Sequence, residues 1–181
     1  QARVLSYRVF YFERASDGAM KSPSDYPARS LAVATTHDLP TLTGFWSGED
    51  LQIRARLSAF TDGAAHHHAW EERQRDKSAI LGALQRENLL PHGVTQDLAT
   101  APAMTTDLCQ AIHTYLARTP SCIVLANLED GLGELSQTNL PGTIDSHPNW
   151  TRKYAIPVDE IMCDERLRRL GSVLCSTRQL R

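Results

Sequence analysis

The sequence predicts an α/β fold in which parallel strands are separated by helices. Two apolar runs, residues 31–36 and 121–128, lack the alternation of a half-exposed strand, which is typical of parallel strands covered on both faces. The stretch between them carries helical patterns, and parallel pairing needs a long crossover connection of this kind. With one more strand near the N-terminus, this order indicates part of an α/β barrel or an open α/β sheet.

The first expected strand is residues 6–13, Ser-Tyr-Arg-Val-Phe-Tyr-Phe-Glu. It is rich in aromatic and β-branched residues, is too short for a helix, and is followed by the polar run 16–18. Three strands cannot close a barrel, so we expect a larger sheet that begins upstream. The opening Gln-Ala-Arg, without an initiator Met, agrees with a piece of a longer chain.

Helices are expected where apolar residues recur at helical spacing among charged ones. Thr105 or Thr106 can cap one that ends before Pro120, because a hydroxyl accepts a hydrogen bond from an unpaired N–H of the first turn. The last expected helix is amphipathic and closes the chain. The remaining helical segments are residues 50–60, 69–88 and 158–181.

Composition narrows the class of partner. The 181 residues include 41% hydrophobic residues, which suits one folded domain with a core. The net charge is -2, from 19 basic and 21 acidic residues, and no long block of one sign is present to attract nucleic acid or anionic lipid. The apolar runs are far shorter than the roughly 20 residues that cross a bilayer. We therefore expect a small or uncharged partner, with no nucleic acid and no membrane.

Histidine and cysteine spacing does not indicate a metal site. The consecutive His66, His67 and His68 point about 100° apart on a helix and cannot converge on one ion, so we interpret them as a solvated face. The chain is too long to depend on disulfides, and its cysteines are expected to be reduced, small buried residues of a cytoplasmic protein. They are Cys109, Cys122, Cys163 and Cys175.

A His-Asp pair, His37 and Asp38, follows the run 31–36 in the segment Thr-Thr-His-Asp-Leu-Pro-Thr-Leu-Thr-Gly-Phe-Trp. The carboxyl ends of barrel strands form the active face of α/β barrels. A carboxylate beside an imidazole can bind sugar hydroxyls there and stabilise positive charge at a substrate carbon. Taken alone, however, such a pair is more typical of a turn that closes a strand.

Further motifs follow the third expected strand, and together they resemble those of a known family. Residues 126–133 read Ala-Asn-Leu-Glu-Asp-Gly-Leu-Gly, residues 137–143 read Gln-Thr-Asn-Leu-Pro-Gly-Thr, and residues 147–153 read His-Pro-Asn-Trp-Thr-Arg-Lys. With the His-Asp segment, they closely resemble bacterial amylomaltase, the 4-α-glucanotransferase family. The resemblance extends over about residues 5–157.

The resemblance implies a fold and a reaction. Residues 1–181 would form the C-terminal portion, about the last three β/α units, of a (β/α)₈ TIM barrel with inserted helices. Members of the family transfer a segment of an α-1,4-glucan to the 4-hydroxyl of an acceptor glucan or glucose by a retaining double displacement. The implied partners are malto-oligosaccharides and a glucose acceptor, without cofactor or metal.

The resemblance also implies site residues. Asp38 would be the catalytic carboxylate that stabilises the distorted sugar, and His37, Asn139 and Pro141 would bind substrate. The nucleophile and the acid/base of the family lie upstream of Gln1, so this chain alone is expected to be inactive. On the residues alone, Asn139 is explained equally well as a turn residue whose side chain bonds its own backbone.

Other conspicuous residues are assigned structural roles. Glu129 and Asp130 are expected to start a helix or cap a loop. Gly44, Phe45 and Trp46 could form a sugar-stacking platform, but core positions are favoured. The residues expected to anchor the last loop by packing and hydrogen bonding are Asn149, Trp150, Arg152 and Lys153.

Two alternatives stay open. The first is a metal-dependent phosphohydrolase that carries a His-Asp pair on a helix, but Pro40 disfavours helical backbone at Leu39. The second is a non-catalytic sugar-binding or assembly fragment, because two of the three carboxylates that the family uses lie outside this chain.

Overall fold

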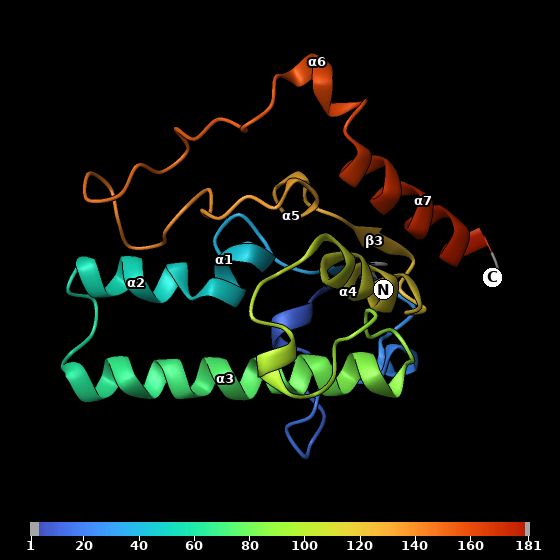
Figure 1. The fold of residues 1–181 in the computed structure, drawn as a ribbon, viewed down its shortest axis with the longest axis horizontal. Coiled ribbons are helices and arrows are strands. Elements are labelled where there is room, and N and C mark those ends of the chain that lie inside the picture. The colour runs from blue at the N-terminus through green and yellow to red at the C-terminus, as the bar shows by residue number, and fades with distance from the viewer. Residues whose placement is uncertain (1–3, 180–181) are drawn as a thin grey trace.

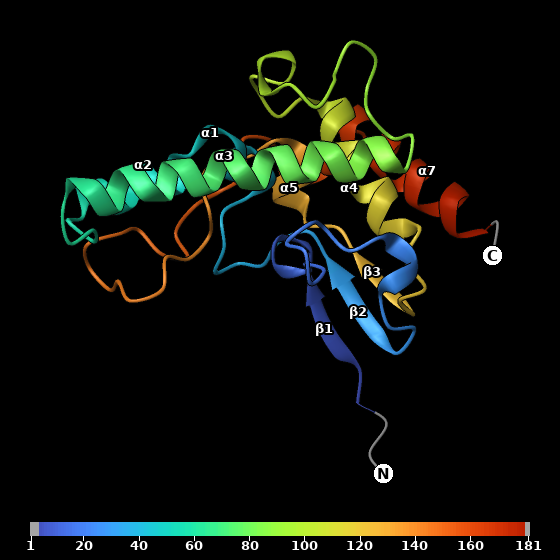
Figure 2. The ribbon, with the colours of Figure 1, turned by 90° about the horizontal axis from the view of Figure 1, so that it is seen from below.

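The computed structural model describes residues 4–179. Within them, three short parallel strands form one sheet, with the middle strand flanked by the other two (Figure 2). The predicted parallel arrangement is confirmed, although each strand is shorter than its apolar run. The strands, in their order across the sheet, are β1 (Ser6–Val9), β2 (Ser30–Val33) and β3 (Ile123–Leu125).

Helices fill the connection between β2 and β3, as parallel pairing requires, and also follow β3. In Figure 1, α2 and α3 run side by side in opposite directions, and α7 packs on α4 and α5. The α-helices are α1 (Leu42–Ser47), α2 (Glu49–Arg56), α3 (Gly63–Arg86), α4 (Thr106–Ala117), α5 (Leu128–Leu132), α6 (Val158–Ile161) and α7 (Glu165–Gln179). The 3-10 turns are η1 (Phe10–Phe12), η2 (Pro23–Asp25) and η3 (Leu98–Thr100).

The helix boundaries follow the capping residues. The predicted cap of α4 is confirmed, because the Thr105 hydroxyl accepts a hydrogen bond from the backbone N–H of Leu108 at 3.1 Å. Helix α3 begins earlier than predicted, because the Asp62 carboxylate accepts one from Ala65 at 2.7 Å. The predicted helix 158–181 is two helices, α6 and α7, and its last two positions lie outside the described residues.

The strand predicted over residues 6–13 ends early, because Phe10 and Tyr11 leave the sheet to fill the core. Phe10 is fully buried, with its ring centroid 5.7 Å from that of Tyr115 in an edge-on contact. The Tyr11 ring stacks on Phe45 at 4.4 Å. Two of the aromatic residues that predicted a strand therefore serve packing between the sheet and the helices.

The core lies between one face of the sheet and helices α3 and α4. Phe45 and Trp46 of α1 are buried in it, which confirms their predicted core positions. A Cβ added at Gly44 would lie 2.4 Å from the carbonyl oxygen of Leu135, so only glycine allows this close approach. Fully or almost fully buried aliphatic residues at the centre are Ala32, Ile80, Leu81, Leu84, Ile112 and Leu116.

The opposite face of the sheet is not fully covered, which corrects the expectation of strands covered on both faces. Tyr7, Ile123 and Leu125 belong to rows of the register that share this face, and they are 55%, 40% and 45% exposed. In the intervening row, Ala32 is fully buried against the helices. An apolar run indicates that a strand can be buried on two faces. It does not indicate that this chain supplies the elements that cover both faces.

The expectation that the cysteines are buried is wrong for three of them. Cys109 is buried in α4, whereas Cys122, Cys163 and Cys175 are exposed. Cys122 precedes β3 at the edge of the sheet, and the other two lie in or next to the C-terminal helices. All four are free thiols. Among the described residues, no helix is both long enough and apolar enough to span a membrane.

Candidate active site

His37 and Asp38 lie in a turn that follows the carboxyl end of β2. The turn is closed by other groups: the N–H of Leu39 donates to the carbonyl of Thr36 at 3.1 Å, and the Thr35 hydroxyl donates to the carbonyl of Pro40 at 2.7 Å. The side chains of His37 and Asp38 are 58% and 45% exposed. They are therefore free to meet a ligand. A phosphohydrolase with its pair on a helix is not supported, because the pair lies in a turn.

Asn139 clamps this turn from a distant part of the chain. Its side-chain N–H donates to Asp38 Oδ1 at 2.6 Å, across 101 residues of sequence. Its backbone N–H donates to the carbonyl of His37 at 3.0 Å. The second carboxylate oxygen, Asp38 Oδ2, lies 3.4 Å from His37 Nε2. Both oxygens of Asp38 thus have a fixed neighbour, and the Asn139 amide does not serve its own backbone as the alternative required.

Pro141, the fourth predicted site residue, lies in the turn that follows Asn139. It is exposed and is followed by Gly142 with φ of +82°. The N–H of Thr143 donates to the carbonyl of Leu140 at 3.2 Å, which closes a tight turn with glycine at the position that needs positive φ. The structure therefore shows a turn role for Pro141, and substrate contact remains a prediction.

The segment after β3 holds the segment after β2 at further points. The side-chain amide of Asn127 donates to the carbonyl of Thr35 at 3.1 Å, and the Thr41 hydroxyl donates to the carbonyl of Glu134 at 2.6 Å. The backbone N–H of Leu42, at the start of α1, donates to Asp130 Oδ1 at 2.7 Å. Because neighbouring parallel strands end at the same edge of a sheet, their loops can be joined in this way.

Asp130 is the most buried acid near the site, at 3% exposure. It lies in the first turn of α5, as predicted, but its carboxylate caps α1 instead. Burial raises the pKa of Asp130 to about 7, the Leu42 N–H opposes this shift, and Glu129 adds to it. Its second oxygen, Oδ2, is buried without a hydrogen-bond partner among the described residues.

Asp130 makes the stability of the fold depend on pH. Its folded pKa of about 7 lies above the ordinary value of about 3.9, so between these pH values the folded chain holds a proton that the unfolded chain has lost. Stability from this group is present below about pH 4 and is lost as the pH rises through about 7. Asp130→Asn keeps an oxygen that accepts from the Leu42 N–H but does not titrate. We expect the unfolding free energy of this variant, relative to that of the native protein, to increase by on the order of 2 kcal/mol when the pH rises from about 5 to about 8.

Urea unfolding of both proteins at the two pH values measures this difference. An unchanged difference in unfolding free energy between the two pH values would show that the Asp130 carboxyl does not titrate in this window.

A polar cavity of about 200 Å³ adjoins His37. It opens between the ends of β2 and β3 and offers hydroxyl, amide and carboxylate groups, which are the groups that bind sugar hydroxyls. Tyr7 of β1 also lines this cavity. Its polar lining consists of Thr35, Thr36, His37, Thr41, Asn127, Glu129, Gln137 and Thr138.

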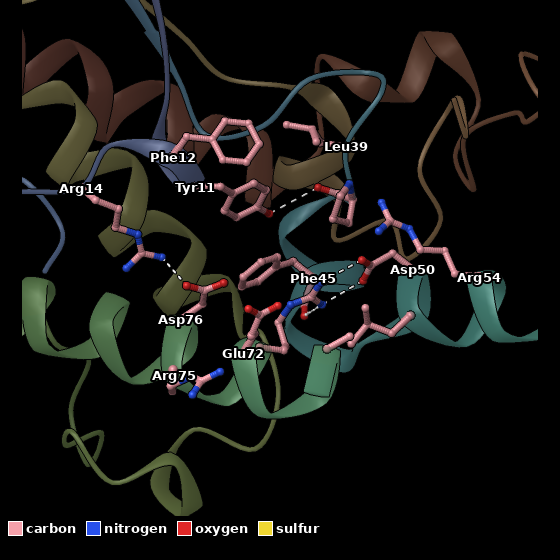
Figure 3. A pocket seen from close by; sticks show the side chains of 14 residues that line it. Tyr11, Phe12, Arg14, Leu39, Phe45, Asp50, Arg54, Glu72, Arg75 and Asp76 are labelled. Atoms are coloured by element: carbon pink, nitrogen blue, oxygen red, sulfur yellow. Dashed lines mark hydrogen bonds and ion pairs between the residues drawn. The ribbon is translucent and has the colours of Figure 1, made fainter. Parts of the chain in front are cut away.

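A larger cavity of about 750 Å³ lies on the other side of Leu39, between the loops after β1 and β2 and helices α2 and α3 (Figure 3). Four of the charged residues in its lining are paired within the fold. Arg73 donates to both oxygens of Asp50 at 2.8 Å, and Arg14 donates to Asp76 at 2.5 Å. These pairs join α2 and the segment after η1 to α3, so we assign them to structure.

The loop after α5 behaves only partly as predicted. Asn149 anchors it: its oxygen accepts from the N–H of Leu140 at 2.9 Å and its amide donates to the carbonyl of Thr143 at 3.0 Å. Arg152 and Lys153, in contrast, are exposed. Trp150 was predicted as an anchor only, but its ring lies 5.1 Å from the ring of His37. No local sequence signal predicts this contact between Trp150 and His37.

The histidines of α3 fit a solvated surface. His67 and His68 are exposed and lie near Glu71, at 3.5 and 3.8 Å. His66 is half-buried, and its Nε2 accepts a hydrogen bond from the indole N–H of Trp70 at 3.0 Å.

Known proteins resemble this chain in sequence and in fold. A family model described as 4-alpha-glucanotransferase matches residues 1–158. A 4-alpha-glucanotransferase of Haemophilus influenzae is 36% identical over 166 residues, which cover 92% of this chain and 23% of that protein. One of Mycobacterium tuberculosis is 28% identical over 181 residues, which cover 94% of this chain and 24% of that protein.

The crystal structure of amylomaltase from Corynebacterium glutamicum has a similar fold, with a TM-score of 0.81 at 24% identity. That match covers 94% of this chain and 25% of the amylomaltase chain. The chain thus spans about a quarter of the length of the relatives that it matches.

Proposed function

Because this chain belongs to the 4-alpha-glucanotransferase family, we propose that it is the C-terminal part of the catalytic domain of such an enzyme. In this proposal β1, β2 and β3 are the last three strands of a (β/α)₈ barrel, and residues 1–181 belong to its final β/α units. The half-exposed Tyr7, Ile123 and Leu125 support the proposal, because the interior of a barrel is a packed core that the remaining strands would complete.

The proposed reaction of the full-length protein, meaning the longer protein that carries this chain, is glucan transfer. A segment of a malto-oligosaccharide is held on an enzyme carboxylate and passed to the 4-hydroxyl of another glucan or of glucose, with retention of configuration. The chemistry needs a nucleophile and an acid/base that flank an oxocarbenium-like transition state. We place both groups outside this chain, and we invoke no cofactor and no metal.

The observation that carries the proposal is the fixed carboxylate of Asp38. Asn139 holds Oδ1 at 2.6 Å and His37 lies 3.4 Å from Oδ2, while the carboxylate remains half-exposed at the carboxyl end of β2. A negative charge held in place stabilises positive charge that develops in the transition state without having to reorganise first. His37 and the free N–H and carbonyl of the Asn139 amide can bind hydroxyls of the same sugar.

Incubation of the full-length protein with maltotriose tests the proposal. We expect glucose together with a ladder of longer oligomers by chromatography, because transfer lengthens one chain as it shortens another. Production of glucose and maltose alone would indicate a hydrolase, and the absence of any product would refute the proposed activity.

The isolated chain is expected to make no ladder under the same conditions. It supplies Asp38 but neither the proposed nucleophile nor the acid/base, so the double displacement cannot start. For the isolated chain, a role as a non-catalytic sugar-binding fragment therefore remains an alternative. Transfer by the isolated chain would show that a carboxylate within it acts as the nucleophile.

A further inference from the structure

A cavity of about 480 Å³ lies beside the candidate site, on the side of the loop after α5. Its volume falls in the range of roughly 300–1,000 Å³ that is typical of small-molecule sites. Glu129 and Thr138 line both this cavity and the smaller one that adjoins His37, so the two spaces are neighbours. The cavity of about 480 Å³ has no role in the reaction as proposed above.

Trp150 lines this cavity, and its side chain is unusually exposed for such a large apolar residue. It is 64% exposed, and its ring centroid lies 5.1 Å from that of His37 at an interplanar angle of 43°. Its backbone has φ of +60°. Residues other than glycine seldom adopt this region, and those that do occur often at functional sites. The Trp150 N–H donates to the carbonyl of Thr138 at 3.0 Å, which keeps the backbone in this conformation.

Polar groups of the lining are held in place by hydrogen bonds to one another. The Tyr154 hydroxyl donates to Glu129 Oε1 at 3.1 Å, and the Thr138 hydroxyl lies 3.4 Å from the same oxygen. These contacts orient the Glu129 carboxylate and leave its other oxygen to accept from a ligand hydroxyl. Arg152 and Lys153, both exposed, add hydrogen-bond donors to the lining.

This combination matches the two-sided chemistry of a pyranose ring. A sugar presents an apolar face of C–H groups, which can lie on an indole ring, and a rim of hydroxyls, which need donors and acceptors at the edge. We propose that Trp150 and Glu129 form a binding position for a glucose unit of a malto-oligosaccharide, next to the unit held at His37 and Asp38. The inference rests on the proposed function, because it takes the ligand to be the same glucan.

Kinetics of the full-length protein with maltotriose and with maltoheptaose test the position. Trp150→Ala is expected to raise KM for maltoheptaose roughly tenfold, which corresponds to about 1.4 kcal/mol, with a smaller change for maltotriose and kcat within about threefold. Trp150→Phe should restore most of the affinity, since a smaller aromatic face remains. Ile144→Ala is the matched control, because Ile144 is 87% exposed in the same loop and does not line the cavity. Unchanged KM values in a folded Trp150→Ala protein would overturn the inference.

A binding measurement separates this inference from the proposed activity. In the Asp38→Asn background, calorimetric titration with maltoheptaose should show affinity reduced roughly tenfold by Trp150→Ala. Such a loss supports the binding position even if no transfer is detected, whereas equal affinities overturn it even if transfer is seen. If Trp150→Ala does not fold, Glu129→Gln decides: it keeps the shape of the cavity, and a weakened affinity for maltoheptaose is expected, with equal affinity counting against the inference.

Discussion

Asp38→Asn in the full-length protein is expected to lower the rate of glucan transfer by roughly 10²- to 10³-fold. The substitution removes the negative charge but keeps the size and shape of the side chain. If the charge acts mainly on the transition state, kcat and kcat/KM should fall together and KM should change little. Product formation from maltotriose at several substrate concentrations measures both constants.

The geometry makes this substitution a clean test. Asn can present its oxygen to the Asn139 amide, which now lies 2.6 Å from Asp38 Oδ1, and its amide to His37. The clamp should therefore survive while the charge is lost. Asp145→Asn is the matched control, because Asp145 is an exposed carboxylate in the loop after Asn139. A loss of less than about tenfold for Asp38→Asn, or an equal loss for the control, would refute the role given to Asp38.

Asp50→Ala is expected to cause the largest loss of stability, about 3–5 kcal/mol. Asp50 and Arg73 are buried, and two N–H groups of Arg73 donate to the two oxygens of Asp50 at 2.8 Å. Arg73 also donates to the carbonyl of Phe45 at 2.6 Å and lies 3.9 Å from the centroid of its ring. Without Asp50, the guanidinium would stay buried beside these groups with no opposite charge.

Thermal and urea unfolding of the full-length protein measure the loss. Glu49→Ala is the neighbouring control: Glu49 pairs at 2.9 Å with Arg56, whose side chain is 64% exposed, and such pairs contribute about 0–1 kcal/mol. Similar effects of the two substitutions would show that burial does not set the strength of the Asp50–Arg73 pair.

Features encoded locally could be predicted from the sequence. The two apolar runs predicted β2 and β3, and Thr105 marked the start of α4, because both depend on near neighbours in the chain. The motif with His37 and Asp38 placed a polar pair after β2 for the same reason. Asn139 was named through a family resemblance, and its contact with Asp38 spans 101 residues that no local pattern connects.

The predictions that were wrong concern what covers a side chain. Tyr7 and Leu125 are apolar strand residues, yet they are half-exposed because no second layer from this chain packs on them. Cys122 is exposed at the edge of the sheet for a related reason. Trp150 was predicted to anchor its loop by packing and hydrogen bonding: its N–H bonds the carbonyl of Thr138 and its ring contacts His37, but the side chain remains 64% exposed. Composition reports that a residue can be buried, whereas burial depends on the elements that surround it.

The exchange of labelled glucose tests the central claim most directly. The full-length protein would be incubated with maltotriose and ¹³C-labelled glucose, and the oligomers separated and analysed by mass spectrometry. Transfer to the 4-hydroxyl of glucose predicts label at the reducing end of maltose and longer oligomers, at a rate that Asp38→Asn lowers by roughly 10²-fold or more. Label that stays in free glucose while maltotriose is consumed, with no oligomer longer than maltotriose formed, would contradict the account, because it would mean that water, and not glucose or a glucan, accepts the sugar.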